Sequence, residues 1–379
     1  MAGFGESKDE GGVILSAAKD PYLRARRKIG TDPSPSARLR MTLCIALLLF
    51  APLLQAQDAL QVSGFALLRG ATHNEGTPLD DNQNAAQVQI GVDWQPSVSF
   101  AAHLHLLARD DADRSRRGHA GVVQAYVEQR IRDRWRFTEG AFFLPTSREN
   151  VDALWESPYT ISSSALNSWM GEELRPIGVD AAYTWRRQLT VGATLFRGND
   201  TFGALPIDRG WALRDHWATL GEWLSAQEGY YTSVSAETDH HLGWSARARW
   251  QTQNATLQLT HIDNRSDALD HGQLLNWDTQ FEIASLELAR GDWTLAAESG
   301  WGTTRVFEFP SPIRASYVLL SRRLPIGRAS LRAETFNRGH ALTAAFFWSP
   351  YGHVRTGVEL TTTGKDQRLA VEVRYFFGG

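Results

Sequence analysis

The sequence predicts an all-β fold, a transmembrane antiparallel up-and-down β-barrel of about 16 strands with long third and fourth outer loops. Three observations support this prediction. Apolar and polar residues alternate along many segments of about ten residues, as in strands with one apolar face. Turn-forming residues separate these segments. The connections between them alternate between short and long, which a soluble β-sandwich has no reason to do.

The amino terminus carries a separate apolar segment. Met41 to Leu54 is an apolar run that follows a basic stretch and precedes the small residue Ala56. It is shorter than the roughly 20 apolar residues that a membrane-spanning helix needs, but it suits the hydrophobic region of a secretory signal peptide. We therefore assign residues 41–56 to a signal peptide.

Composition narrows the classes of function. Residues 1–40 have mixed charge and are interpreted as a leader from a start codon placed too early, or as a genuine extended leader, which leaves 57–379 for the barrel. The single cysteine, Cys44, lies in the signal peptide, so the exported part has no disulfide and no thiolate ligand. The net charge of −3 is balanced and no basic patch stands out, so nucleic acid is not an expected partner.

The alternation is clearest in residues 87–95, where Val88, Ile90, Val92 and Trp94 share one face and polar residues the other. Two segments, 135–144 and 276–290, alternate poorly, and a β-bulge near Ala284 would restore the second. The predicted strands are about 60–70, 85–95, 100–109, 121–131, 135–144, 177–186, 189–197, 241–251, 255–263, 276–290, 293–303, 314–323, 328–338, 341–350, 354–362 and 367–377.

The connections fall into two sets. The short ones are 96–99, 132–134, 187–188, 252–254, 291–292, 324–327 and 351–353. The longer ones are 71–84, 110–120, 145–176, 198–240, 264–275 and 304–313. Short turns at one end and long loops at the other are typical of barrels in a bacterial outer membrane. Aromatic residues near strand ends fit the girdles of such barrels, although a soluble β-core would also contain them; these are Trp94, Trp185, Trp244, Trp250, Trp293, Trp301, Trp348 and Tyr351.

With these features the whole of 57–379 resembles the porins of Gram-negative outer membranes. The final segment, Gln367 to Phe377 (QRLAVEVRYFF), is similar to the family's closing strand, and Phe142 to Asp180 looks like the third-loop region of phosphate-selective and anion-selective porins. The resemblance implies a passive diffusion channel for small hydrophilic solutes in the outer membrane. It also implies lipid, lipopolysaccharide and the barrel-assembly machinery as partners, and a homotrimer.

The chain departs from the family in two places. Porins usually end on an aromatic residue, whereas Gly378 and Gly379 follow Phe377 here. Phosphate-selective porins are rich in lysine at the constriction, but Lys365 is the only lysine after the signal peptide. The resemblance therefore does not extend to phosphate selectivity.

Alternation assigns charged residues to the inner face of the barrel, where they would line the pore. The predicted arginines are Arg130, Arg186, Arg247, Arg249, Arg332, Arg355, Arg368 and Arg374. The predicted acids are Asp93, Glu128, Asp180, Glu298, Glu334, Glu359 and Glu372. Such residues could set a transverse field across the pore, or they could simply pair between neighbouring strands.

The third connection, 145–176, is the candidate constriction. Its polar residues could line the narrowest point of the pore: Arg148, Glu149, Asp152, Glu156, Ser162, Ser163, Ser164, Asn167, Ser168, Glu172, Glu173 and Arg175. Trp155, Tyr159 and Trp169 could offer apolar faces to sugar rings or anchor the loop to the wall. We favour anchoring, because buried aromatic side chains mostly pack.

Three further patterns have weaker interpretations. Leu213 to Leu224 has helical periodicity, and we expect a short helix that caps its own loop, although Gly221 weakens it. His103 and His105 share one strand face, but two imidazoles without a third ligand are a poor metal site, so we expect polar residues of the lumen and no metal or cofactor. The acidic stretches at 80–81 and 263–267 could bridge cations to lipopolysaccharide.

Two other classes of barrel remain as alternatives to the channel. A non-conducting barrel could act as an adhesin or a ligand receptor. An enzymatic barrel would need a nucleophile with a base, but no GxSxG motif occurs and no base lies near Ser162 to Ser164 in sequence. We therefore do not expect an enzyme.

Overall fold

A computed structural model describes residues 59–73, 84–110, 115–116, 120–150, 154–208, 217–226, 229–337, 339–364 and 366–378. The predicted leader and signal peptide, the acidic pair at 80–81, and Asp152 and Lys365 lie outside the described residues.

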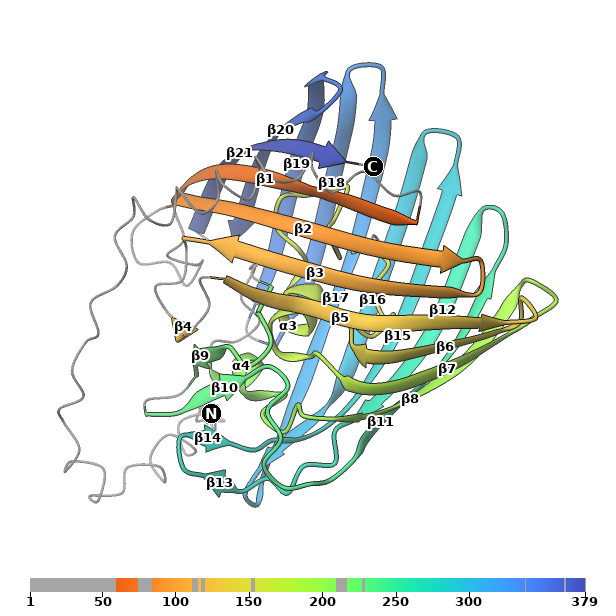
Figure 1. Ribbon diagram of the computed structural model, residues 1–379. Helices are drawn as coiled ribbons and strands as arrows, with labels where there is room; N and C mark the ends of the chain where they lie inside the picture. The colour runs from red at the N-terminus through yellow and green to blue at the C-terminus, as the bar shows by residue number, and fades with distance from the viewer. Residues whose placement is uncertain are drawn as a thin grey trace, which may run out of the picture.

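Sixteen of the described strands form one closed antiparallel barrel, in which each strand pairs with the next barrel strand along the chain and β1 pairs with β21 (Figure 1). This confirms the predicted sixteen-stranded up-and-down barrel. The strands are β1 (Leu60–His73), β2 (Asn84–Ser97), β3 (Phe100–Arg109), β5 (Ala120–Ile131), β6 (Trp135–Ala141), β7 (Ile177–Trp185), β8 (Leu189–Arg197), β11 (Gly243–Gln251), β12 (Ala255–Asp263), β15 (Asp278–Arg290), β16 (Trp293–Val306), β17 (Phe309–Leu324), β18 (Gly327–Phe336), β19 (Gly339–Tyr351), β20 (Val354–Thr363) and β21 (Asp366–Gly378).

Two details of the strand prediction are wrong. The expected bulge at Ala284 does not occur, since this residue pairs with Leu259 on one side and Ser299 on the other in an unbroken register. The predicted connection 304–313 is almost entirely strand, because β16 and β17 continue to a tight turn. Pro310 and Pro312 led us to expect a loop here, because proline has no N–H for the strand ladder. A proline is nevertheless tolerated in a strand where the ladder does not use that N–H.

The two faces of the wall differ as the alternation predicted. Outward side chains are apolar and about half exposed, as in Trp94, Trp185, Trp250 and Trp293, which lie near the ends of their strands. Inward side chains are mostly polar and buried by what fills the lumen. An apolar outer belt is what a lipid environment requires of a barrel wall.

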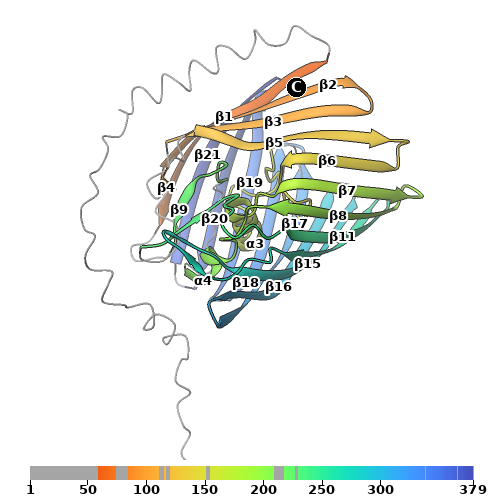
Figure 2. The ribbon, with the colours of Figure 1, turned by 60° about the horizontal axis from the view of Figure 1, so that its bottom comes forward.

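Two long connections enter or cover the barrel. Loop 3 (residues 142–176) folds inside and carries α3 (Ala165–Glu173), visible within the barrel in Figures 1 and 2. Ser164 caps α3 by accepting a hydrogen bond from the Asn167 N–H. Loop 4 (residues 198–242) contributes α4 (Ala204–Asp208) and two short strands. The long third and fourth loops are thus confirmed.

A small sheet lies at the long-loop end, at the left of Figure 1. Its strand order is β13 (Asp270–His271), β14 (Leu274–Leu275), β10 (Tyr231–Ser233), β9 (Trp223–Ser225) and β4 (Ser115–Arg116). Three separate connections therefore meet over this end of the barrel.

The helix expected at Leu213 to Leu224 is wrong for the described part, 217–224. Residues 217–222 have no helical structure and Trp223 begins β9. Gly221 has a φ of +71°, a conformation that ends a helix rather than continuing it. Among the described helices, none is long and apolar enough to cross a membrane.

Candidate functional site

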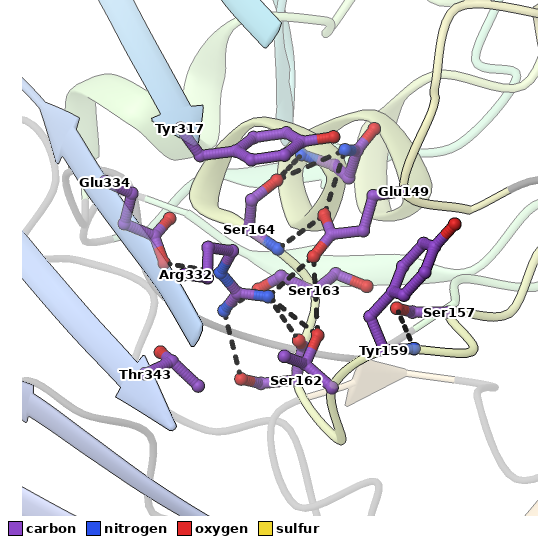
Figure 3. A network of polar contacts seen from close by, with 12 residues as sticks. Glu149, Ser157, Tyr159, Ser162, Ser163, Ser164, Tyr317, Arg332, Glu334 and Thr343 are labelled. Carbon is purple, nitrogen blue, oxygen red and sulfur yellow. Dashed lines mark hydrogen bonds and ion pairs between the residues drawn. The ribbon is translucent and has the colours of Figure 1, made fainter. Parts of the chain in front are cut away.

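Loop 3 is held to the inner wall by a buried arginine. Arg332 of β18 is fully buried, and its guanidinium donates hydrogen bonds to Glu149 Oε1 at 2.6 Å, to Glu334 Oε1 at 3.0 Å and to the Ser162 carbonyl at 2.7 Å (Figure 3). One side chain therefore joins the wall to two parts of loop 3. A buried charge of this kind is tolerated because it is paired and its donors are used.

Wall carboxylates hold the backbone of the same loop. Glu359 of β20 accepts from the Ile161 N–H at 2.7 Å, and Glu334 accepts from the Ala165 N–H at 2.7 Å. Glu298 of β16 accepts from the Arg148 N–H at 2.8 Å. These charge-assisted bonds fix the loop at three points along its length.

A second arginine centre lies where the barrel closes. Arg374 of β21 pairs with Glu372 and with Glu156 of loop 3, and Arg69 of β1 donates to Glu372 at 3.1 Å. Gln89 of β2 also donates to Glu156, at 3.1 Å. The strands that close the barrel are thereby tied to loop 3.

Arg175 joins loop 3 to loop 4, and among the described residues its hydrogen-bond acceptors are backbone carbonyls. It is fully buried, and its guanidinium donates to the carbonyls of Val123 at 2.9 Å, Gly171 at 3.0 Å and Ala218 at 3.1 Å. It also lies 3.5 Å from the centre of the Phe143 ring. Burial lowers the pKa of Arg175 to about 9, so it is still charged at neutral pH.

Glu173, at the end of α3, makes the other link to loop 4. It accepts hydrogen bonds from Trp169 Nε1 at 2.5 Å, from the Gly203 N–H at 3.0 Å and from the Leu205 N–H at 3.2 Å. Burial raises the pKa of Glu173 to about 7, against the opposing effect of these hydrogen bonds. Its charge state therefore changes near neutral pH.

Most of the predicted constriction residues do not face open space. Glu149, Ser163, Asn167, Glu172, Glu173 and Arg175 are buried. Several of these side chains bind the loop to itself or to the wall, so the prediction that they line the pore is wrong. Arg148 is the exception, since it lines a cavity.

The aromatic residues of loop 3 are anchors, as we favoured. Trp155 stacks on Phe143 with ring centroids 4.3 Å apart, and Trp169 stacks on Phe202 at the same distance. Tyr159 packs in a buried cluster with Tyr317 of the wall. A larger apolar cluster, which includes Trp155, Trp169 and Trp217, occupies the lumen between loops 3 and 4.

The predicted wall residues lie mostly on the inner face. Arg247 forms a two-point ion pair with Asp180, at 2.5 and 2.8 Å. Arg355 lies over the Phe347 ring, and Arg368 is 3.9 Å from Glu359. Arg368 and Glu359 lie on neighbouring strands, as the pairing alternative predicts, whereas Arg247 reaches Asp180 across the intervening β8.

Arg186 and two histidines differ from the other predicted residues of the inner wall. Arg186 is wrong as a pore residue, because β7 ends at Trp185 and the arginine lies in the turn, 4.6 Å from the Trp185 ring centre. His103 contacts Asp93, and His105 contacts Gln89 at 2.7 Å. In the described residues, the acidic group close enough to hold a metal is Asp200, Glu237 and Asp239, which includes neither histidine.

The barrel wall has cavities next to loop 3 and elsewhere. The loop 3 cavity, about 350 Å³, lies between loop 3 and the wall formed by β5, β6, β7 and β11. The rim cavity, about 280 Å³, lies nearer the short turns and shares Arg136 and Arg249 with it. A third cavity of about 590 Å³ touches Tyr317, Glu334 and His340 and shares no lining residue with the other two.

Arg136 was not among the predicted pore residues. It lies on the inner face of β6, at the junction of the loop 3 and rim cavities. The segment 135–144 alternates poorly, so no face was assigned to its residues. The pairing of Arg136 with Ala182 and Arg130 in the register is the information that was lacking.

No family model matches the chain, and no curated protein matches it. Solved structures share the fold at low identity. OmpF of Salmonella typhi, in a complex with daunomycin, is similar over 84% of this chain and 97% of that chain, with a TM-score of 0.57 and 11% identity. A mutant porin of Rh. blastica covers 84% of this chain and 100% of its own, with a TM-score of 0.49 and 10% identity. A loop-deletion mutant of OmpT, an outer membrane protein of Vibrio cholerae, has the same coverage, with a TM-score of 0.49 and 11% identity. The likeness to OmpF confirms the expected porin-like fold.

Proposed function

We propose that this protein is a passive diffusion channel for small hydrophilic solutes in a bacterial outer membrane. The observation that carries the proposal is the position of loop 3, folded inside a closed barrel and fixed by Arg332 and three wall carboxylates. A fixed constriction of this kind sets the size and charge of the solutes that pass. The polar cavities beside loop 3 provide water-accessible volume within the wall.

A non-conducting barrel is the second candidate, and one observation favours it. The apolar cluster of loops 3 and 4 fills part of the lumen, and the sheet of β4, β9, β10, β13 and β14 lies over the long-loop end. A receptor or adhesin would use such a covered end as a binding surface. We prefer the channel, because a polar cavity remains between loop 3 and the wall and a second polar cavity continues from it toward the short turns.

Location and partners follow from the same proposal. The apolar outer belt suits lipid, and the apolar segment at 41–56 would direct export as a signal peptide. Lipopolysaccharide, the barrel-assembly machinery and two further copies in a homotrimer are the proposed partners. We propose no enzymatic activity. The Ser162 hydroxyl donates to Glu359 at 2.7 Å, and because this carboxylate also accepts from the Ile161 and Ser162 N–H groups, we give the contact the role of holding loop 3.

Liposome swelling tests the channel. Liposomes that contain the refolded barrel should swell in isotonic solutions of small uncharged sugars, at rates that fall as the sugar becomes larger. Liposomes with heat-denatured protein serve as the control. No swelling with any sugar, from protein shown to be a folded barrel, would favour the non-conducting candidate.

A further inference from the structure

The loop 3 cavity gathers arginines from three separate elements. Arg136 comes from β6, Arg249 from β11 and Arg148 from loop 3. Arg249 is repelled by Arg148, by Arg136 and by Arg247 beside them. Such convergence of like charges is unfavourable unless an anion or solvent compensates it.

The carboxylates of this cavity are already engaged. Glu128 accepts from Arg130 Nε at 2.7 Å and lies 3.9 Å from Arg136 Nε. Asp180 is held by both terminal nitrogens of Arg247. The lining itself has three guanidinium groups, those of Arg136, Arg148 and Arg249, against these two carboxylates, and both carboxylates are also bound by arginines outside the lining. Glu298, outside the lining, also attracts Arg148.

Two of these arginines have no ion-pair partner among the described residues. In the part of the chain that the structure describes, neither Arg148 nor Arg249 forms an ion pair, and the Nε of Arg148 is buried without a hydrogen-bond partner. The backbone of Arg148 is nevertheless fixed, because its N–H donates to Glu298. A positioned guanidinium with a buried, unsatisfied donor is a group for which an oxyanion would supply the missing partner.

The same cavity has an apolar side. Trp155 lines it and is backed by the parallel ring of Phe143, while Phe142 and Tyr126 contribute further aromatic surface. A bare inorganic anion would leave this surface in contact with water. An anion that carries an apolar body would cover it, and about 350 Å³ is within the usual range for a small-molecule site.

The cavity can be reached from the short-turn end. The rim cavity shares Arg136 and Arg249 with it and adds Arg130 and Arg134, opposed by Asp133. A positively lined approach raises the local concentration of anions and speeds their entry.

We propose that the loop 3 cavity is a binding site for small organic anions. The oxyanion of the ligand, a carboxylate or a phosphate ester, contacts Arg136, Arg148 and Arg249, and its apolar body lies against Trp155 and Phe142. Passage of such anions through the barrel rests on the proposed channel function. Binding of the anions in the cavity does not, because it could occur in a non-conducting barrel as well.

Titration calorimetry on the full chain, refolded in detergent, tests the site with benzoate as the probe. Benzamide has the same ring without the charge, and inorganic phosphate has charge without the ring. Arg148→Gln and Arg249→Gln should each weaken benzoate binding by roughly tenfold or more, because each removes charge-assisted hydrogen bonds. Arg187→Gln, an exposed arginine in the turn after β7, is the matched control and should bind as the unaltered protein does.

The outcomes separate the parts of the proposal. Saturable binding of benzoate but not benzamide, weakened by both cavity variants, supports it. Equal binding by all variants, or no binding of benzoate, overturns it. Equal affinity for phosphate and benzoate would overturn the role given to Trp155. Arg148→Gln keeps the test valid if Arg249→Gln does not fold, since the backbone N–H of Arg148, which the substitution keeps, makes the hydrogen bond to Glu298 that holds the loop. Binding of benzoate without conductance would contradict the proposed channel and support the anion site. Conductance without benzoate binding would support the channel and contradict the anion site.

Discussion

Replacing Arg332 by alanine tests whether the wall fixes loop 3. The change leaves Glu149 and Glu334 buried without their shared cation and removes the hydrogen bond to the Ser162 carbonyl. Removal of one partner from a buried ion pair costs about 3–5 kcal/mol. The strand ladders around Arg332 do not depend on its side chain, so most of this cost falls on the docking of loop 3.

A cost of this size has a measurable consequence. Since 1.36 kcal/mol corresponds to a tenfold change, opening of loop 3 should become at least about 100-fold more frequent. Hydrogen exchange followed by mass spectrometry should show faster exchange in residues 160–168, with the barrel strands unchanged. Arg322→Ala is the control, because Arg322 lies on the outward face over the Trp293 ring. Unaltered exchange of 160–168 in Arg332→Ala would refute the idea that this arginine fixes the loop.

Three other changes probe the same region. The pKa of Glu173 is raised from 4.5 to about 7, so its contribution to the packing of loops 3 and 4 is fully present below about pH 4.5. About 3 kcal/mol of this contribution is lost as the pH rises through 7. Proteolysis of loop 4 should therefore become faster over that range, and Glu173→Gln should abolish the pH dependence. In Gly171→Ala the new Cβ would lie 2.2 Å from the Trp217 ring, and this steric clash should destabilise the fold by about 1–3 kcal/mol and displace loop 4. The variant should have a lower thermal midpoint and faster proteolysis of loop 4. An unchanged midpoint would contradict the packing of Trp217 against Gly171. Replacing Arg247 and Arg249 together by alanine should shift ion preference toward cations, and an unchanged reversal potential in a salt gradient would place both outside the conduction path.

The strands were predictable because each wall residue faces one of two different environments. The predicted 189–197 and 255–263 coincide with β8 and β12. The prediction was less exact where the contrast between the two faces is weak. β15 carries Glu282 outward, paired with His261, and was predicted with a bulge that the register does not have. β17 was predicted to begin only after its two prolines, whereas it begins at Phe309.

The site was only half predictable. Alternation assigned Arg332, Glu334 and Glu359 to the inner face, where they are found. It could not give their partners, because Arg332 and Glu149 are 183 residues apart in sequence. Polar residues of loop 3 were therefore expected to face the pore, whereas the wall binds many of them, and of the predicted constriction residues that the structure describes Arg148 lines the loop 3 cavity.

Single-channel conductance in a planar bilayer is the most direct test of the central claim, that loop 3 narrows an open pore without closing it. The refolded barrel should give discrete steps with a linear current–voltage relation, and the steps should be larger in Arg332→Ala, in which loop 3 is released. A folded barrel that stays silent both as the unaltered protein and as Arg332→Ala would contradict the claim.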